Sequence, residues 1–266
     1  MNTMNTINNI CNIQKKFYQK KGSPATIFIT NDNKIIKSIP VNKNREYNII
    51  KGIYNKIQNY ELKQLFVNII QIKKCDKYNY YLLEKYKGDI DSSFLLSINS
   101  NYKKNLLFQC LLAIIFMNHE LKVYHNDLYY KTSIRNVMYN NLETTLNLEY
   151  KNIKITCKKY LCKIIDFGWV SRKPGFRTTE YHEKYFKTNK IISEVLLFSF
   201  FYLQTINKSN NRSNNKSNNK FTQYIISILN KMSNLVENLL ESHNLLTPLN
   251  FDITFFNLFY DFYDKI

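Results

Sequence analysis

Three residues with oxygen-bearing side chains stand beside apolar segments, at places where a chain would leave a hydrophobic core. Asp127 and Asp166 each follow an apolar segment, and Asn136 comes directly before one. Phosphoryl transfer uses a carboxylate to orient the acceptor hydroxyl, and carboxylate and amide oxygens to bind Mg²⁺. The chain between the two acids is long enough for a hairpin that would bring both to one site. The three residues therefore predict a phosphotransferase active site.

Two tripeptides around these acids resemble motifs of the protein kinase family. His125-Asn126-Asp127 is similar to the catalytic-loop motif, and Asp166-Phe167-Gly168 matches the metal-binding motif in full. The resemblance implies an α+β, two-lobed kinase-like fold with a small β-rich N-lobe and a mainly helical C-lobe. It also implies ATP and Mg²⁺ as cofactors, Asp127 as the catalytic carboxylate, and Asn136 and Asp166 as metal ligands. The competing interpretation is that Asp127 caps a helix or turn and Asp166 begins an ordinary turn.

The catalytic-loop segment departs from the spacing of the family. In the family the metal-binding Asn follows the catalytic Asp by five residues, a position that Thr132 occupies here. Asn136 is favoured, through an insertion of four residues, because an apolar strand follows it; Thr132 is the rival. Tyr129 stands where serine/threonine kinases usually place a Lys. Lys131 is therefore predicted to supply this catalytic positive charge, with Arg135 as the alternative.

Two further positions bear on regulation and on the C-lobe. Asn126 replaces the Arg that normally pairs with a phosphorylated activation loop, which argues against that switch. Glu194 precedes an apolar segment and resembles the Asp that opens the central helix of the kinase C-lobe; a plain amphipathic helix start is the alternative. The segment after Gly168 is short and contains no APE-like motif.

The N-terminal third extends the resemblance to nucleotide binding. Gly22, Ala25 and Ile27 lie where kinases have a glycine-rich loop, although only one of its three glycines is kept. Lys37 resembles the phosphate-binding lysine, because it lies in a β-rich segment whose alternation turns it toward the predicted cleft. Lys34 is the alternative register.

Two more elements would complete the nucleotide site. Glu46, near the start of the following helix, is the predicted partner that would hold Lys37 in place. Glu84 to Tyr86 would form the hinge between the lobes and border the nucleotide. Ordinary solvated charge is the alternative for Lys37 and Glu46.

Hydrophobic periodicity indicates the elements that position these residues. Two β-rich runs separated by turn residues predict a hairpin, and isoleucines at helical spacing predict an amphipathic helix after it. The low-complexity segment 207–220 predicts a disordered surface loop. Strands are expected over 26–30, 34–39, 66–72, 78–83 and 162–165, and helices over 45–57 and 104–120. The expected organisation is a flexible tail over 1–14, an N-lobe over 15–86 and a C-lobe over 87–266.

Composition limits the partners and the compartment. The 266-residue chain has a formal net charge of +18, but its lysines are scattered, so we expect a solvated basic surface and no specific nucleic-acid partner. The five cysteines lack zinc-ligand spacing, which favours free thiols in a reducing compartment and hence a cytoplasmic protein. No apolar run reaches the ~20 residues of a membrane span. The oligomeric state stays open.

These features together predict ATP- and Mg²⁺-dependent phosphoryl transfer to serine or threonine hydroxyls of a protein substrate. The eroded glycine loop, the His-Asn-Asp motif and the Asn- and Lys-rich composition are similar to divergent serine/threonine kinases of large DNA viruses, which would place the protein in the host cytoplasm or virion. One alternative is a pseudokinase that serves as a binding scaffold. The other is a small-molecule kinase of the aminoglycoside or choline type.

Overall fold

The chain forms an α+β structure, which confirms the fold class at that level. The computed structural model describes residues 26–30, 34–41, 44–131, 133–210 and 215–265, where helices alternate with small antiparallel sheets. Two compact units, Met1–Tyr86 and Lys87–Ile266, divide the chain. The division follows Tyr86, the last residue of the predicted hinge. The predicted tail over 1–14 lies outside the described residues.

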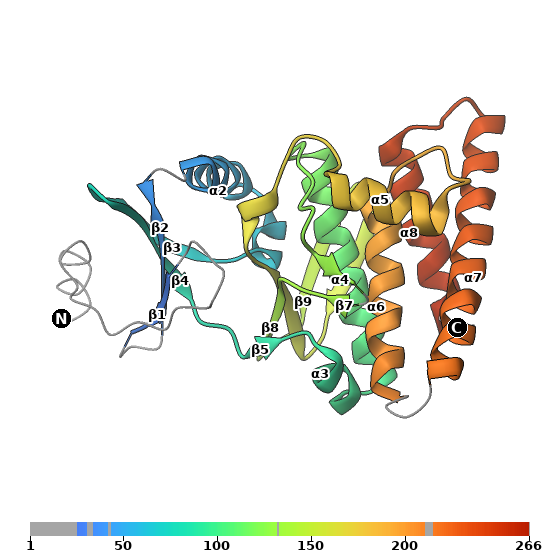
Figure 1. The fold of residues 1–266 in the computed structure, drawn as a ribbon, viewed down its shortest axis with the longest axis horizontal. Helices are drawn as coiled ribbons and strands as arrows, with labels where there is room; N and C mark the ends of the chain where they lie inside the picture. Colours follow the sequence, from blue (N-terminus) through green and yellow to red (C-terminus); the bar gives the residue numbers. More distant parts are fainter. Residues whose placement is uncertain (1–25, 31–33, 42–43, 132, 211–214, 266) are drawn as a thin grey trace. The chain divides into compact units, whose positions relative to one another are not determined.

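The first unit contains a four-stranded antiparallel sheet with the strand order β1-β2-β4-β3 (Figure 1). β1 and β2 pair as the predicted hairpin, with Ile27 opposite Lys37. The helix α2 (Asn44–Ile57) follows β2, as the isoleucine spacing predicted. A short 3₁₀ helix, η3 (Glu61–Leu65), then leads to the last two strands. The strands are β1 (Thr26–Ile29), β2 (Lys34–Pro40), β3 (Ile69–Lys74) and β4 (Tyr78–Glu84).

One face of this sheet lies against α2. Ile50, Ile53 and Ile57 form the buried side of the helix. The ring of Tyr47 on α2 lies 6.0 Å from the ring of Tyr81 on β4. Because alternate residues of a strand point to opposite faces, the face that carries Tyr81 is the one that α2 covers.

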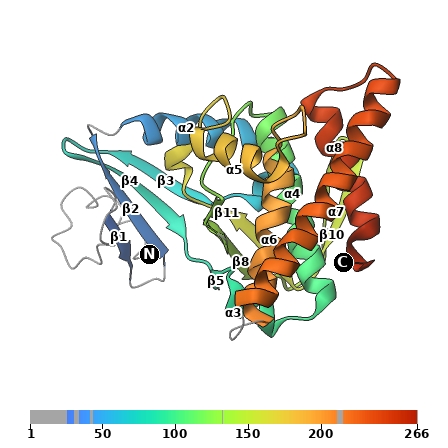
Figure 2. The same ribbon diagram turned by 45° about the vertical axis from the view of Figure 1, so that its right-hand side comes forward.

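The helices of the second unit pack around α4 (Ser100–His119), which is buried over most of its length. Asn99 caps its first turn by accepting a hydrogen bond from the amide of Tyr102 at 3.0 Å. α4 contacts α6 and α8 as well as strands of this unit, so it is apolar on all sides rather than along one stripe. α7 packs against both α6 and α8 (Figures 1 and 2). The other helices are α3 (Ser92–Ser97), α5 (Phe176–Phe186), α6 (Glu194–Asn210), α7 (Asn215–Ser242), α8 (Pro248–Phe262) and the 3₁₀ turn η5 (Tyr263–Lys265).

Short antiparallel strands make up the rest of the second unit. β8 lies between β11 and β5 in a three-stranded sheet (Figure 2). β9 pairs with β10, and β6 pairs with β7. All of them except β5 lie in the sequence between Asp127 and Asp166. They are β5 (Gly88–Asp89), β6 (Tyr129–Tyr130), β7 (Ser133–Ile134), β8 (Val137–Asn141), β9 (Leu146–Tyr150), β10 (Ile153–Cys157) and β11 (Tyr160–Ile164), followed by the 3₁₀ turn η4 (Phe167–Trp169).

The low-complexity segment differs from the predicted disordered loop. α6 continues to Asn210 and α7 begins at Asn215, while residues 211–214 lie outside the described part of the chain. Extending a helix costs far less than nucleating one. Polar residues can therefore prolong two helices whose apolar parts, such as Phe201 and Leu229, are already buried.

Two expectations from composition can be compared with the structure. Cys110, Cys157 and Cys162 are buried free thiols, whereas Cys75 is disulfide-bonded, so the free-thiol prediction is wrong for Cys75. Disulfide pairing depends on distance in space, which irregular spacing along the chain does not reveal. Cys11 lies outside the described residues. In the described part of the chain, no helix is both long enough and apolar enough to cross a membrane.

Candidate active site

The pairing of β8 with β11 brings the two candidate metal ligands together. β8 starts directly after Asn136, β11 ends two residues before Asp166, and Val137 pairs with Ile164. The ladder continues one step further, because the amide of Ile165 donates to the main-chain oxygen of Asn136 at 3.0 Å. Residues from the two motifs therefore meet at one end of this sheet.

His125 links the catalytic-loop motif to the same place. Its Nε2 atom is 2.9 Å from the main-chain oxygen of Ile165. The imidazole is buried, and burial lowers the pKa of His125 to about 4. The ring is therefore neutral at physiological pH and can donate this one hydrogen bond, which holds the two motifs side by side.

Both candidate ligands have left-handed backbone conformations. The φ angle is 57° at Asn136 and 61° at Asp166, and Asn126 has a similar value of 62°. Asn and Asp enter this region more readily than other residues with a side chain. Such conformations concentrate at functional sites, and here they turn the polar side chains out of the adjoining strands.

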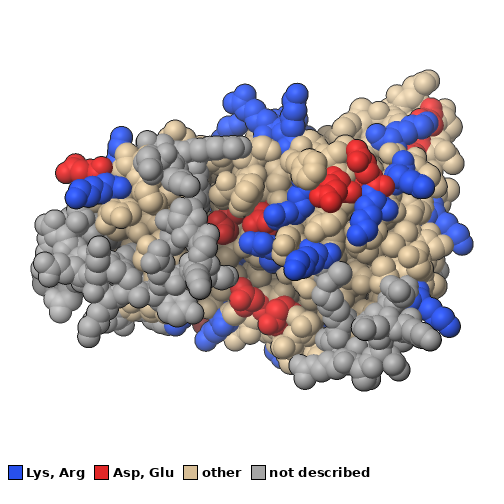
Figure 3. Space-filling model, viewed as in Figure 1, with Lys and Arg blue, Asp and Glu red and all other residues tan. Residues whose placement is uncertain are grey.

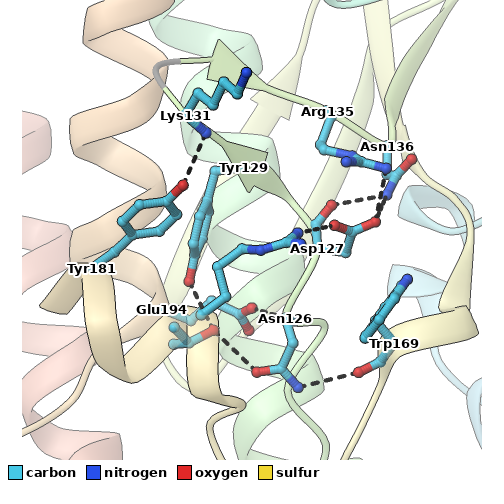
Figure 4. Close-up of polar contacts among 11 residues, drawn as sticks. Asn126, Asp127, Tyr129, Lys131, Arg135, Asn136, Trp169, Tyr181 and Glu194 are labelled. Atoms are coloured by element: carbon cyan, nitrogen blue, oxygen red, sulfur yellow. Dashed lines mark hydrogen bonds and ion pairs between the residues drawn. The ribbon is translucent and has the colours of Figure 1, made fainter.

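The carboxylate of Asp127 is the centre of the site. Nδ2 of Asn136 donates to the main-chain oxygen of Asp127 at 2.8 Å and to its Oδ2 atom at 2.9 Å. Nη2 of Arg135 lies 3.0 Å from Oδ2, and Nη1 of Arg177 lies 2.7 Å from Oδ1. Figure 4 shows Arg135 and Asn136 approaching this carboxylate together. Both of its oxygens are thus engaged.

Asp127 is covered by side chains that themselves reach solvent. Its side chain is 2% exposed, but those of Arg135 and Arg177 are 43% and 32% exposed. Burial raises the pKa of the Asp127 carboxyl above its ordinary value, and Arg135, Asn136 and Arg177 act against this rise. Asp166 is close enough to add to the rise by repulsion. The carboxylate is therefore covered by partly exposed cations rather than enclosed in the core.

A small hairpin contains the extra residues of the catalytic loop. β6 and β7 pair between Asp127 and Asn136, with Tyr129 opposite Ile134. The buried ring of Tyr129 stacks on Phe201 of α6 at 4.8 Å. Because the hairpin folds back on itself, it lengthens the loop without moving its two ends apart. The insertion before Asn136 stays a prediction, and its rival Thr132 lies outside the described residues.

Lys131 lies at the turn of this hairpin. Its amide donates to the Tyr181 hydroxyl at 3.0 Å (Figure 4), and its Nζ atom is 5.4 Å from the centre of the Tyr130 ring. The cation that contacts Asp127 from this loop is Arg135, the alternative that the sequence left open. The catalytic role of Lys131 stays a prediction.

Asn126 holds the segment that follows the Asp-Phe-Gly motif. It occupies the position of the family's Arg, and its amide makes hydrogen bonds in both directions (Figure 4). Gly175 fits closely here, because a Cβ atom on it would lie 3.0 Å from Cγ and Oδ1 of Asn126. Nδ2 donates to the main-chain oxygens of Tyr124 (3.1 Å) and Trp169 (3.3 Å) and to Oγ of Ser171 (2.8 Å), while Oδ1 accepts from the amide of Gly175 and from Oγ1 of Thr178 (3.0 Å).

Glu194 binds the backbone of the His125-Asn126-Asp127 segment. Its carboxylate accepts the main-chain N–H groups of His125 at 3.2 Å and Asn126 at 2.9 Å. Burial raises the pKa of Glu194 to about 7, although these two hydrogen bonds act in the opposite direction. This residue opens α6 and at the same time fixes the backbone of the motif, which a plain helix start would not do.

The first unit contains the other predicted site residues. Lys37 pairs across the sheet with Tyr81 and so lies on the face that α2 covers, whereas Lys34 lies on the opposite face. This placement favours Lys37 over Lys34 as the lysine that could meet α2. Glu46 belongs to α2, but its side chain lies outside the described residues.

The remaining nucleotide-site predictions are placed as follows. Gly22 and Ala25 lie outside the described residues, and Ile27 is a partly exposed residue of β1. Glu84 ends β4. Tyr86 is buried, and its hydroxyl accepts a hydrogen bond from the amide of Asn68 at 2.7 Å. Tyr86 therefore fixes the end of the first unit.

The sequence reasoning missed Arg177 altogether. Arg177 is the second residue of α5, and its guanidinium contacts Asp127 from a segment fifty residues further on. The rings of Tyr130 and Trp169 flank that guanidinium at 5.0 and 6.0 Å. An isolated Arg without a motif around it carries no signal of such a contact; only the short stretch between Gly168 and α5 hinted that this segment stays near the motif.

Comparisons with known proteins do not assign the chain to a family. No family model matches the chain, and no curated protein matches it significantly. Among the described residues, no three or more His, Cys, Asp or Glu side chains form a metal-binding group. The predicted ligand pair differs from such a group, because it combines one carboxylate, Asp166, with the amide of Asn136.

Proposed function

We propose that the protein is a protein serine/threonine kinase of kinase-like two-lobed fold, which transfers the γ-phosphoryl group of ATP to serine or threonine hydroxyls. One observation supports this proposal: Asp127 and Asn136 from one stretch of the chain lie near Asp166 from another, at the end of the β8–β11 pair. The first unit would serve as the N-lobe and the second as the C-lobe.

In the proposed reaction, Asp127 interacts with the acceptor hydroxyl of the substrate. The hydroxyl oxygen forms a bond to the γ-phosphorus, the bond from that phosphorus to the bridging oxygen breaks, and ADP leaves with the electron pair. Asp127 accepts the hydroxyl proton. Its raised pKa makes the carboxyl a better proton acceptor than an exposed Asp. Most of the rate enhancement would come from positioning and charge neutralisation.

The residues present fit a magnesium site. Asp166 offers a carboxylate, and Asn136 offers its amide oxygen, because the amide nitrogen is the atom that donates to Asp127. Hard oxygen ligands of this kind, completed by phosphate oxygens and water, suit Mg²⁺. The bound ion would neutralise the negative charge of the phosphates. In the first unit, Lys37, steadied by Glu46, would hold the α- and β-phosphates.

One observation favours a second candidate, a pseudokinase scaffold. Both carboxylate oxygens of Asp127 are occupied, Oδ1 by Arg177 and Oδ2 by Arg135 and Asn136. An acceptor hydroxyl cannot reach either oxygen unless one guanidinium moves away. If the guanidinium groups never leave, the site binds but does not transfer phosphate.

Phosphate transfer from labelled ATP tests the proposal. Wild type, Asp127→Asn, Asp166→Asn and the control Asp261→Asn, an exposed residue of α8, are compared on casein, histone and small alcohol acceptors. We expect phosphoserine or phosphothreonine from wild type and the control only. Thermal shifts with ATP and Mg²⁺ should persist in Asp127→Asn. No transfer by wild type, with a nucleotide shift retained, identifies the scaffold; transfer by Asp127→Asn at the wild-type rate removes the assignment.

A further inference from the structure

Basic side chains gather around Asp127 on its solvent side. The partly exposed guanidinium groups of Arg135 and Arg177 contact the two oxygens of the carboxylate. Both also lie beside the exposed ring of Tyr130, at 5.9 and 5.0 Å, and Nζ of Lys131 is 5.4 Å from the same ring. Three cations therefore meet at one aromatic ring, directly beside the candidate catalytic carboxylate.

Three cations, Arg135, Arg177 and Lys131, are gathered around Tyr130, and two carboxylates, Asp127 and Asp166, lie beside them. Asp166 is the acid whose charge reaches Asp127, and the proposed function assigns it to Mg²⁺. On the face drawn in Figure 3, Lys and Arg side chains lie interspersed with Asp and Glu side chains. The site is therefore defined by the contacts of these three cations and not by the charge of the whole face. A local surplus of positive charge that reaches solvent attracts anionic ligands.

Arg177 occupies the place that an acceptor hydroxyl needs. Its Nη1 atom is 2.7 Å from Oδ1 of Asp127, and it reaches this position from α5 between two aromatic rings. Leaving Oδ1 would break a charge-assisted hydrogen bond, which is among the stronger polar contacts in proteins. A second carboxylate beside the acceptor would replace that bond with an equivalent one.

We propose that the site selects acceptor residues flanked by Asp or Glu, and that Arg177 exchanges Asp127 for the carboxylate of the substrate. The inference rests on the proposed function and names its substrate class. An extended peptide advances about 3.3 Å per residue. Since Arg177 contacts Asp127 directly, the recognised acid lies within about two residues of the acceptor. Arg135 and Lys131 add attraction on the side of β7.

Peptide binding tests the proposal without relying on catalysis. Fluorescent peptides with Ala in place of the acceptor, flanked by Glu, Gln or Lys, are titrated into wild-type protein. We expect the Glu peptide to bind about tenfold more tightly than the Gln peptide, as one charge-assisted hydrogen bond would give. The ratio of the affinities for the Glu and Gln peptides should fall toward one in Arg177→Gln. It should be partly kept in Arg177→Lys. Lys231→Gln, which removes an exposed lysine of α7, should keep it in full.

Transfer kinetics on the matching serine peptides separate this inference from the proposed function. We expect kcat/KM to follow the order Glu, Gln, Lys in wild type. Transfer without an acidic preference overturns the inference and leaves the proposed function standing. Tight binding of the Glu peptide without any phosphate transfer overturns the proposed function and leaves the acidic preference of the site standing. If Arg177 serves the nucleotide phosphates, Arg177→Gln raises KM for ATP equally with every peptide, and that result also overturns the inference.

Discussion

The side-chain amide of Asn136 donates to Asp127 twice, to its main-chain oxygen at 2.8 Å and to Oδ2 at 2.9 Å. The two residues are the ends of the loop that contains the β6–β7 hairpin. The residues between Asp127 and Asn136 fold back on themselves in this hairpin, so the two ends of the loop stay close together. This contact places Asn136 beside Asp127, and its role as a metal ligand stays a prediction.

Replacing Asn136 should abolish most of the activity. Asn136→Ala removes both hydrogen bonds to Asp127 and the amide oxygen proposed as a ligand. We expect phosphate transfer to fall about 100-fold or more, as for other groups that stabilise charge at a reacting centre, and the Mg²⁺ concentration at half-maximal rate to rise. Thr132→Ala is the matched control and should stay close to wild type. A larger loss of phosphate transfer in Thr132→Ala would instead favour Thr132 as the metal ligand, at the five-residue spacing of the kinase family.

Tyr129 should be required for stability rather than for chemistry. Its buried ring stacks on Phe201, and its hydroxyl donates to Oγ1 of Thr178 at 3.1 Å. Tyr129→Phe loses that bond and should lower the free energy of unfolding by about 1 kcal/mol. Tyr129→Lys, which installs the family's usual residue, buries an amine and should cost several kcal/mol, on the order of the penalties for unpaired buried charges.

Urea unfolding of the two Tyr129 variants provides the measurement, with Tyr130→Phe as the control. Tyr130 is 43% exposed, and its change should stay within about 0.5 kcal/mol of wild type. A Tyr129→Lys protein as stable as wild type would show that this position is open to the catalytic cleft instead of packed on α6.

Gly175 and Gly52 should respond to Ala in opposite ways. At Gly175 the new Cβ would lie 3.0 Å from two atoms of Asn126, so Asn126 must shift and its contacts with the following segment weaken. We expect faster proteolytic cleavage between Gly168 and Gly175 in Gly175→Ala. Gly52, within α2, has nothing within 4 Å of its would-be Cβ. Gly52→Ala should raise the free energy of unfolding by roughly 0.5–1 kcal/mol. Unchanged cleavage in Gly175→Ala would contradict the role given to Asn126.

Glu194 should make stability depend on pH in a defined window. Its folded-state pKa of about 7 is raised above the unfolded value of 4.5, so the folded state binds the proton more tightly. The stability that this protonation supplies is fully present below pH 4.5 and is lost as pH rises through about 7. We expect the free energy of unfolding of wild type, relative to Glu194→Gln, to fall between pH 5 and pH 8 by on the order of 1–3 kcal/mol. A difference that is constant with pH would show that Glu194 does not titrate in this range.

The relative measurement is needed because His125 acts in the opposite sense. Burial lowers the pKa of His125 to about 4, so stability is lost as pH falls from its unfolded value of 6.5 toward 4. The Gln variant keeps His125, and this contribution cancels when the two proteins are compared. His125→Gln in the wild-type background then reports the histidine separately.

The elements and the acids could be predicted from the sequence because each depends on local pattern. Strand alternation and isoleucine spacing gave the β1–β2 hairpin and α2. Asp127 and Asp166 stood out because polar residues beside apolar runs mark the ends of buried strands. The strand after Asn136 was also expected, because Val137 and Met138 are apolar.

The contacts of the site depend on residues that approach through space, and the sequence could not reveal them. Arg177 reaches Asp127 from α5, and Glu194 reaches the backbone of His125 from α6. Neither contact could be inferred from hydrophobic periodicity or from a sequence motif. The helical ends of the low-complexity segment were missed for a related reason, since packing of α6 and α7 overrides the weak propensity of Asn and Ser.

The hydrogen bonds of Asn126 have one more consequence. All of them are made by an uncharged amide, so added salt screens none of them. No covalently attached phosphate is needed for them to form. The contacts of Asn126 with Trp169, Ser171 and Thr178 should therefore be insensitive to salt, whereas the ion pair of Arg177 with Asp127 in the same segment should weaken as salt is added.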